Sequence, residues 1–344
     1  MVHYHWDFRN FKLKINMNQK SNNNQEAKRE WFAIIITSAI SAVFALMGIY
    51  VIKDYGIAIF IFIPFLMGSL PSFVYSRKNE LTWRKSWKMA LLTLTVCTAS
   101  LLLFAIEGLI CIVMALPIAI LFQFIGCLLA FTYLNRSKNK DIKPMFIFIA
   151  LIPLVQWTEK NIQPEVKPVH TSIIIHASPE QVWKQVIEFP RLSAPTEYLF
   201  KAGIAYPTHA TIQGSGVGSV RYCHFTTGCF VEPVKIWDEP KLLQFSVLEQ
   251  PAPMKELSFW DIDAPHLHDY FVSKKGQFKL TPLANGDTKL EGTTWYYHNI
   301  RPATYWRTWS DYIIHKIHLR VLTHIKKNAE RNVKMSHQKT WNTN

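Results

Sequence analysis

The chain has 344 residues, of which 49% are hydrophobic and 18% are charged, and its formal net charge is +14. A chain of this length accommodates two domains of ordinary size. The long apolar runs lie in its first half, so we expect one part in a membrane and the other in water. Lys and Arg are spread over the N-terminus, the short loops and the C-terminal tail. This spread argues against nucleic-acid binding and favours a membrane protein with basic cytoplasmic segments.

The N-terminal half contains five apolar runs. Residues 1–30 are polar and are expected to form a mobile cytoplasmic tail. Residues 31–157 are the predicted transmembrane region, with spans at 31–52, 57–75, 87–106, 109–133 and 145–157. A hydrocarbon core needs about 20 apolar residues. The last run is short and contains Pro153, so it is either a tilted fifth span, which we favour, or a re-entrant segment.

The charges of the loops predict the orientation of these spans. The tail and the loops at 77–88 and 136–143 are basic, whereas the turns at 53–54 and 107–108 are not. The positive-inside rule places the basic segments in the cytoplasm, and five spans then place the C-terminal half outside it. Glu107 lies between two apolar runs. We interpret it as a turn residue at the headgroups, with a relay or docking role as the alternative.

The C-terminal half alternates short strands with turns and ends in a long helix. A strand at 171–177 is rich in β-branched residues, and Ser178 and Pro179 then begin a helix that runs to about residue 189. Further strands are expected at 219–225, 229–237, 242–250, 270–280 and 288–298. A helix at about 304–331 carries an apolar stripe, and a polar tail follows at 333–344. This order predicts an α+β domain with an antiparallel sheet.

Three segments of this half resemble a known superfamily. IIIHASPEQVWKQVIEFP, at residues 173–190, resembles the opening of SRPBCC domains, which are START-like and polyketide cyclase-like. The order of a strand, short helices, a long antiparallel sheet and a long C-terminal helix is similar to their helix-grip fold, over residues 166–332. GQFKLTPLANGDTKLEGTTWYYHNIRPATYWRTW and IIHKIHLRVLTHIKK look like a membrane-anchored bacterial branch. The resemblance implies a curved sheet around the last helix and a multi-pass protein of the bacterial plasma (inner) membrane.

The resemblance also implies an apolar cavity that accommodates lipids, polyketide-like or aromatic compounds. The leading hypothesis is therefore membrane-tethered binding of a hydrophobic or amphipathic small molecule. One alternative is a cyclase- or dehydratase-type enzyme that uses cavity His and Tyr side chains as acid and base. Another is a membrane assembly protein whose helix-grip domain docks a protein partner. The bilayer and the small molecule are the expected partners. The sequence has no motif of a hydrolase.

Several side chains are candidates for the lining of the cavity. They are apolar, aromatic or polar residues of the sheet and the last helix: Trp237, Trp295, Trp306, Ser310, Ile317, His318 and His324. Trp260 belongs to the same aromatic group. A polar group among buried aliphatic side chains needs a hydrogen-bond partner, so Ser310 and the histidines pair with the sheet or contact a ligand. Each tryptophan packs in the core or lines the cavity.

Two pairs of opposite charge are expected in this half. Glu291 with Arg320 would join the last strand to the last helix, and Arg221 with Glu232 would pair across a hairpin. Such pairing offsets the cost of burying either charge alone.

No metal site or cofactor is predicted. Two close histidine pairs have spacings that place their rings on one face: His266 with His268, and His315 with His318. Neither pair has further ligands at a family spacing. A disulfide between Cys223 and Cys229 is possible only if this half faces an oxidising compartment, and the sequence leaves this open.

Overall fold

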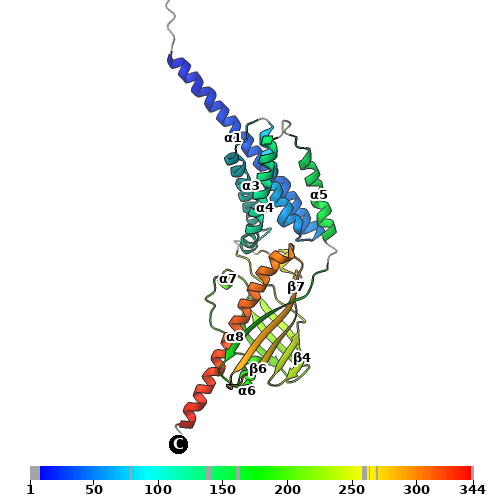
Figure 1. The fold of residues 1–344 in the computed structure, drawn as a ribbon, viewed down its shortest axis with the longest axis vertical. Helices are drawn as coiled ribbons and strands as arrows, with labels where there is room; N and C mark the ends of the chain where they lie inside the picture. Colours follow the sequence, from blue (N-terminus) through cyan, green and yellow to red (C-terminus); the bar gives the residue numbers. More distant parts are fainter. Residues whose placement is uncertain are drawn as a thin grey trace, which may run out of the picture. The chain divides into compact units, whose positions relative to one another are not determined.

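The computed structural model describes residues 8–77, 79–136, 141–159, 163–257, 262, 264–268 and 270–341. The chain divides into two compact units. The first comprises Met1–Phe104 and Ala115–Asn161, and the second comprises Ala105–Met114 and Ile162–Asn344. Figure 1 shows helices alone in the first unit and a sheet with helices in the second.

The first unit is built from helices. They are α1 (Phe8–Leu46), the π-helical η1 (Met47–Ile52) and η2 (Ala58–Phe62), α2 (Ile63–Ser76), α3 (Trp83–Leu103), α4 (Leu109–Arg136) and α5 (Lys143–Glu159). Residues 8–30, for which the sequence predicts a mobile cytoplasmic tail, belong to α1. Lys85 of α3 forms ion pairs with Glu26 at 2.8 Å and with Glu30 at 3.2 Å. These ion pairs join α1 to α3 at residues 26–30.

Helices α2 and α4 approach closely at two glycines. A Cβ atom on Gly68 would overlap with the backbone carbonyl of Gln123, and a Cβ on Gly126 would overlap with that of Phe65. Helices that pack in a membrane use small residues in this way, because backbone contact replaces the hydrophobic effect there. The crossing therefore depends on both glycines.

In the part of the chain that the structure describes, four helices are long and apolar enough to cross a membrane. They are Asn23–Ile52, Ala58–Ser76, Trp83–Leu103 and Leu109–Arg136. Helix α5 has 17 residues with Pro153 inside it, which is shorter than the roughly 20 residues that a comfortable span needs. The four helices are compatible with membrane localisation.

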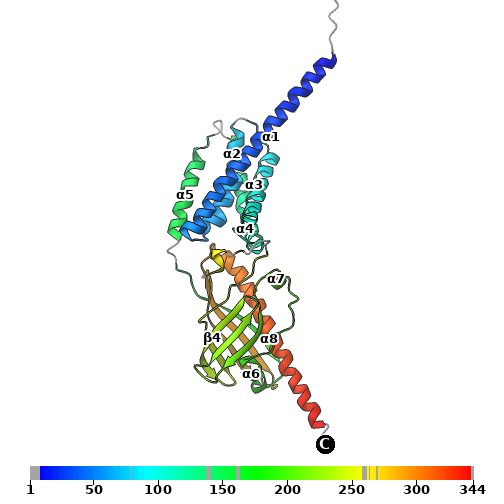
Figure 2. The ribbon, with the colours of Figure 1, turned by 180° about the vertical axis from the view of Figure 1, so that it is seen from behind.

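Among its described residues, the second unit contains one antiparallel sheet of seven strands. In chain order these are β1 (Lys167–Ile175), β2 (Pro207–Gln213), β3 (Val220–Phe225), β4 (Gly228–Asp238), β5 (Leu242–Ser246), β6 (Phe271–Pro282) and β7 (Thr288–His298). Their order in the sheet is β1-β7-β6-β5-β4-β3-β2. Figures 1 and 2 show the sheet curled along the long helix α8 (Ala303–Trp341). This is the helix-grip architecture of START-like and polyketide cyclase-like domains, so the fold prediction is confirmed.

The main core lies between the sheet, α8 and the short helix α6 (Pro179–Ile187). Leu290 of β7 and Leu322 and Ile325 of α8 are fully buried there. Ser178 caps α6 in a capping box, with Pro179 at the first helical position, as the sequence indicates. The structure differs from the predicted elements in several places: β1 begins earlier, at Lys167, β2 was not predicted, β5 ends at Ser246, and α8 continues through the expected polar tail as far as Trp341.

A second, smaller core includes the first turns of α4. Ile110 packs with Phe200 of the short helix α7 (Tyr198–Lys201) and with Ile204, and Ile317 of α8 packs against this cluster. Residues 105–114 are therefore part of the second unit, although the helix that they begin continues into the first.

Candidate functional site

The interior of the helix grip contains a buried ion pair among aromatic rings, between Arg221 and Glu232. Arg221 of β3 lies opposite Glu232 of β4 in the register of the hairpin, and its guanidinium donates to the Glu232 carboxylate. The guanidinium carbon lies 5.6 Å from the ring centre of Phe189, 5.2 Å from Phe245 and 5.6 Å from Phe278. Burial raises the pKa of Glu232 and Arg221 opposes this shift only in part, whereas Glu232 keeps the pKa of Arg221 raised.

Two N–H groups of this interior have no acceptor within the part of the chain that the structure describes. They are Nε of Arg221 and Nε1 of Trp183, and we call them the interior donors. Trp183 lies on α6, is fully buried and meets Trp237 edge to face, with ring centres 5.6 Å apart. A buried donor without an acceptor costs about 1–3 kcal/mol. The interior donors are therefore sites where an oxygen atom would be stabilised.

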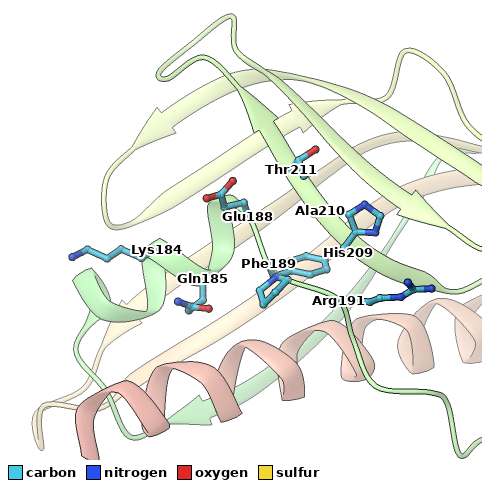
Figure 3. Close-up of a pocket in the computed structure, with 9 residues that line it drawn as sticks. Lys184, Gln185, Glu188, Phe189, Arg191, His209, Ala210 and Thr211 are labelled. Atoms are coloured by element: carbon cyan, nitrogen blue, oxygen red, sulfur yellow. The ribbon is translucent and has the colours of Figure 1, made fainter. Parts of the chain in front are cut away.

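A groove of about 560 Å³ opens between α6 and β2. Its rim carries Lys184, Glu188, Arg191 and His209, whose side chains are drawn in Figure 3. Burial and the charge of the stacked His224 ring lower the pKa of His209. Phe189 also lines the groove, yet it is 2% exposed and packs on Arg221. Phe189 thus separates the groove from the guanidinium.

The two histidines of α8 that were candidates have partners in the protein. His318 hydrogen-bonds with Thr294 at 2.8 Å and with Thr171 at 3.1 Å, and burial lowers its pKa to about 4. His324 hydrogen-bonds with Asn328 at 2.9 Å, and burial lowers its pKa as well. Both arrangements fit the structural interpretation of these histidines.

The other candidates are divided between three places. Trp237 lies beside Trp183 in the interior, and Ile317 belongs to the smaller core. Trp306 is buried at the start of α8, and Ser310 lies near the Tyr296 hydroxyl. These four residues therefore do not line a single cavity.

The prediction that Trp295 lines the cavity is wrong. Its neighbours along β7 face α8: a Cβ on Gly292 would contact Leu322, and Thr294 reaches His318. Because side chains alternate along a strand, Trp295 points to the opposite face. There the Lys275 ammonium lies 4.0 Å from its ring centre, so Trp295 does not line the interior.

The expected pair of Glu291 with Arg320 is wrong. Glu291 lies on the outer face of β7, 3.9 Å from His170, while Arg320 donates to the backbone carbonyls of Ser193 and Pro207. Arg320 thereby fixes the segment before β2 to α8.

The cysteines of this half are free thiols. Cys223 faces Phe230 and Cys229 faces His224 across the hairpin, so the two cysteines are not opposite each other. A disulfide between them is excluded in this fold. Trp260 lies outside the described residues.

Comparisons with solved structures give similarities to helix-grip proteins over about half of the chain. A norcoclaurine synthase mutant from Thalictrum flavum with a transition-state analogue is 14% identical, covers 50% of this chain and 99% of its own, and has a TM-score of 0.32. The Zhui aromatase/cyclase from a Streptomyces species is 13% identical, covers 49% and 96%, and has a TM-score of 0.32. A structural-genomics target from Nitrosospira multiformis is 20% identical, covers 47% and 94%, and has a TM-score of 0.30. No protein-family model and no curated protein sequence matches the chain.

Proposed function

We propose that the second unit binds an amphipathic small molecule with an apolar body and an oxygen acceptor, and that the apolar helices hold it at a membrane. The observation that carries this proposal is the pair of interior donors, Arg221 Nε and Trp183 Nε1, inside an aromatic and aliphatic core. Ligand sites of this kind combine mostly apolar walls with a few polar groups that fix orientation. Carbonyl or carboxylate oxygens of the ligand would accept from these donors.

The groove beside α6 is the proposed entrance. Its volume of about 560 Å³ lies within the range of about 300–1,000 Å³ that small-molecule sites occupy. Lys184 and Arg191 at the rim attract an anionic head, and Phe189 separates the rim from the interior. Rotation of the Phe189 ring would join the groove to Arg221. The ligand would then enter with its acceptor group first.

The binding assay uses the full-length protein in detergent, with a long-chain fatty acid and its methyl ester as probes in native mass spectrometry. We expect the fatty acid to bind, and Trp183→Phe to weaken its binding at least about 10-fold, because the variant lacks one hydrogen-bond donor to a charged acceptor. Trp157→Phe is the matched control, since Trp157 is 69% exposed on α5.

Two outcomes count against the proposal. In one, neither probe nor any molecule of a lipid extract binds the folded protein. In the other, Trp183→Phe and Trp157→Phe bind the fatty acid as well as the unchanged protein does. Binding of a protein partner alone would favour the assembly hypothesis instead.

Acid–base catalysis by a cyclase has a weaker basis. His318 already bonds with two threonines, and its pKa of about 4 keeps it neutral near pH 7. Tyr296 donates to Asp311 at 2.6 Å, and burial raises the pKa of its hydroxyl. An effective acid or base titrates near the working pH, and both shifts lead away from it. We therefore favour a binding protein over an enzyme.

We also propose that the second unit lies outside the cytoplasm, with α5 as a fifth span. The basic loops support this orientation by the positive-inside rule. A periplasmic reporter enzyme fused after Asn344 should be active, and a cytoplasmic fluorescent reporter at the same place should be dark. The reverse pattern would make α5 a re-entrant or peripheral helix.

A further inference from the structure

Four side chains with metal-binding chemistry meet inside the second unit. Glu107 and Cys111 come from the segment Ala105–Met114, and Glu256 and His266 come from the chain between β5 and β6. The Cys111 thiol lies 2.6 Å from a Glu256 oxygen and 2.8 Å from Nε2 of His266, and Nδ1 of His266 lies 3.4 Å from a Glu107 oxygen. One donor atom from each of Glu107, Cys111 and His266 fits within 4.8 Å of the others.

The cluster is buried. Glu107 and Glu256 are each 8% exposed, and His266 is 7% exposed. Two buried carboxylates are costly because each loses its hydration, and a divalent cation between such groups offsets that cost.

The backbone holds Glu256 in place. One Glu256 oxygen accepts from the backbone N–H of Ile110 at 3.0 Å, in the first turn of α4, where the helix dipole favours an anion. Gly108 allows this approach, because a Cβ atom there would overlap with the Glu256 carboxylate. On the other side, the N–H of Lys255 donates to the carbonyl of Gly203 at 2.8 Å. The carboxylate is therefore fixed before any ion binds.

We propose that Glu107, Cys111 and His266 bind a divalent transition metal of the zinc class. A carboxylate, a thiolate and an imidazole are the three ligand types that zinc uses in proteins, and a thiolate disfavours magnesium and calcium. Three protein ligands leave a fourth position for water or for Glu256. The metal links the start of α4 to the turn η3 (Pro265–Leu267), two segments that lie 155 residues apart in sequence.

Metal binding requires the thiol to lose its proton. The Cys111 S–H bond breaks, the sulfur keeps the electron pair and donates it to the metal, and the proton passes to Glu256 and then to solvent. Ligand atoms around a tetrahedral zinc ion lie about 3.5 Å apart, given bonds of about 2.0–2.3 Å. The thiol and its two neighbours, now 2.6 and 2.8 Å apart, must therefore separate by roughly 0.7–0.9 Å when the ion binds.

The first test is a cobalt titration of the full-length protein in detergent, after removal of metals with a chelator. We expect one ion per chain and a thiolate-to-cobalt charge-transfer band. Cys111→Ser should abolish the band and His266→Gln should weaken binding at least about 10-fold. Cys229→Ser and His268→Gln are the matched controls, because neither residue belongs to the cluster, and both should bind like the unchanged protein.

A second measurement covers the case in which Cys111→Ser does not fold. In the unchanged protein, zinc should slow alkylation of Cys111 at least about 10-fold, as followed by peptide mass spectrometry, and should leave Cys229 unaffected. The proposal is overturned if cobalt binds without the band, if the controls lose the ion as readily as the cluster variants do, or if zinc does not change the alkylation of Cys111.

Discussion

Removal of Glu232 alone should destabilise the second unit far more than removal of the whole ion pair. The side chains of Arg221 and Glu232 are 2% and 8% exposed, so neither charge is solvated by water. Glu232→Leu leaves the guanidinium between the rings of Phe245 and Phe278 without its anion. An unpaired buried charge costs about 3–5 kcal/mol, whereas an apolar replacement of both partners is often neutral or stabilising.

The assay is a double-mutant cycle on the full-length protein, with Glu232→Leu, Arg221→Met and the two changes together. The free energy of local unfolding is measured by hydrogen exchange of the β3 and β4 amides. We expect each single change to cost about 3–5 kcal/mol and the double change to cost less than about 2 kcal/mol. Additive costs would contradict this reasoning, as would a single change that costs under about 1 kcal/mol, because water would then reach the interior.

Three shorter predictions concern stability. Burial lowers the pKa of His318 from 6.5 to about 4, so the unfolded chain binds the proton more readily. The contribution of His318 to the free energy of unfolding should be fully present above about pH 6.5 and should fall by about 3 kcal/mol as the pH drops to about 4. His318→Asn should flatten this pH profile of unfolding. Gly203→Ala should lower the free energy of unfolding by at least about 3 kcal/mol in a denaturation curve, because φ is +114° and the new Cβ would overlap with a backbone carbonyl. The control Gly216→Ala, at φ +80° with open space around it, should lower it by about 1 kcal/mol. Ile317→Asp should lower the melting temperature by several degrees, because it places a carboxylate in the smaller core, whereas His315→Ala should lower it little. Equal melting temperatures for the two variants would mean that Ile317 does not pack in that core.

Features that depend on neighbouring residues could be predicted from the sequence. Strand β7 begins and ends where expected, because the turn before it contains Gly286 at φ +84° and the strand is rich in β-branched and aromatic residues. Arg221 and Glu232 face each other because the tight turn between β3 and β4 fixes the register of the hairpin. In each case the signal lies within about a dozen residues.

Features that depend on the direction of a side chain, or on segments far apart, could not be predicted. A shift of one residue along β7 exchanges the two faces of the sheet on which its side chains lie. The sequence does not indicate which face is buried, and the wrong assignment places Glu291 and Trp295 in the interior. The partners of Arg320 are backbone carbonyls, which carry no sequence signal. Cys111 and His266 belong to segments with no common periodicity, so only the fold brings them together.

The indole of Trp183 provides a last prediction, on stability without ligand. Trp→Ala in a core costs about 3–5 kcal/mol, and Trp183→Phe keeps most of the apolar contact with Trp237 while it loses part of an edge-to-face pair worth about 0.5–1.5 kcal/mol. The same change removes an interior donor whose burial costs about 1–3 kcal/mol. The two effects oppose each other, so the delipidated variant should unfold within about 1 kcal/mol of the unchanged protein in a urea titration followed by hydrogen exchange of α6. A loss of about 3 kcal/mol or more would mean that the indole N–H has an acceptor in the folded protein without ligand, and Trp183 would then have no role in holding a ligand oxygen.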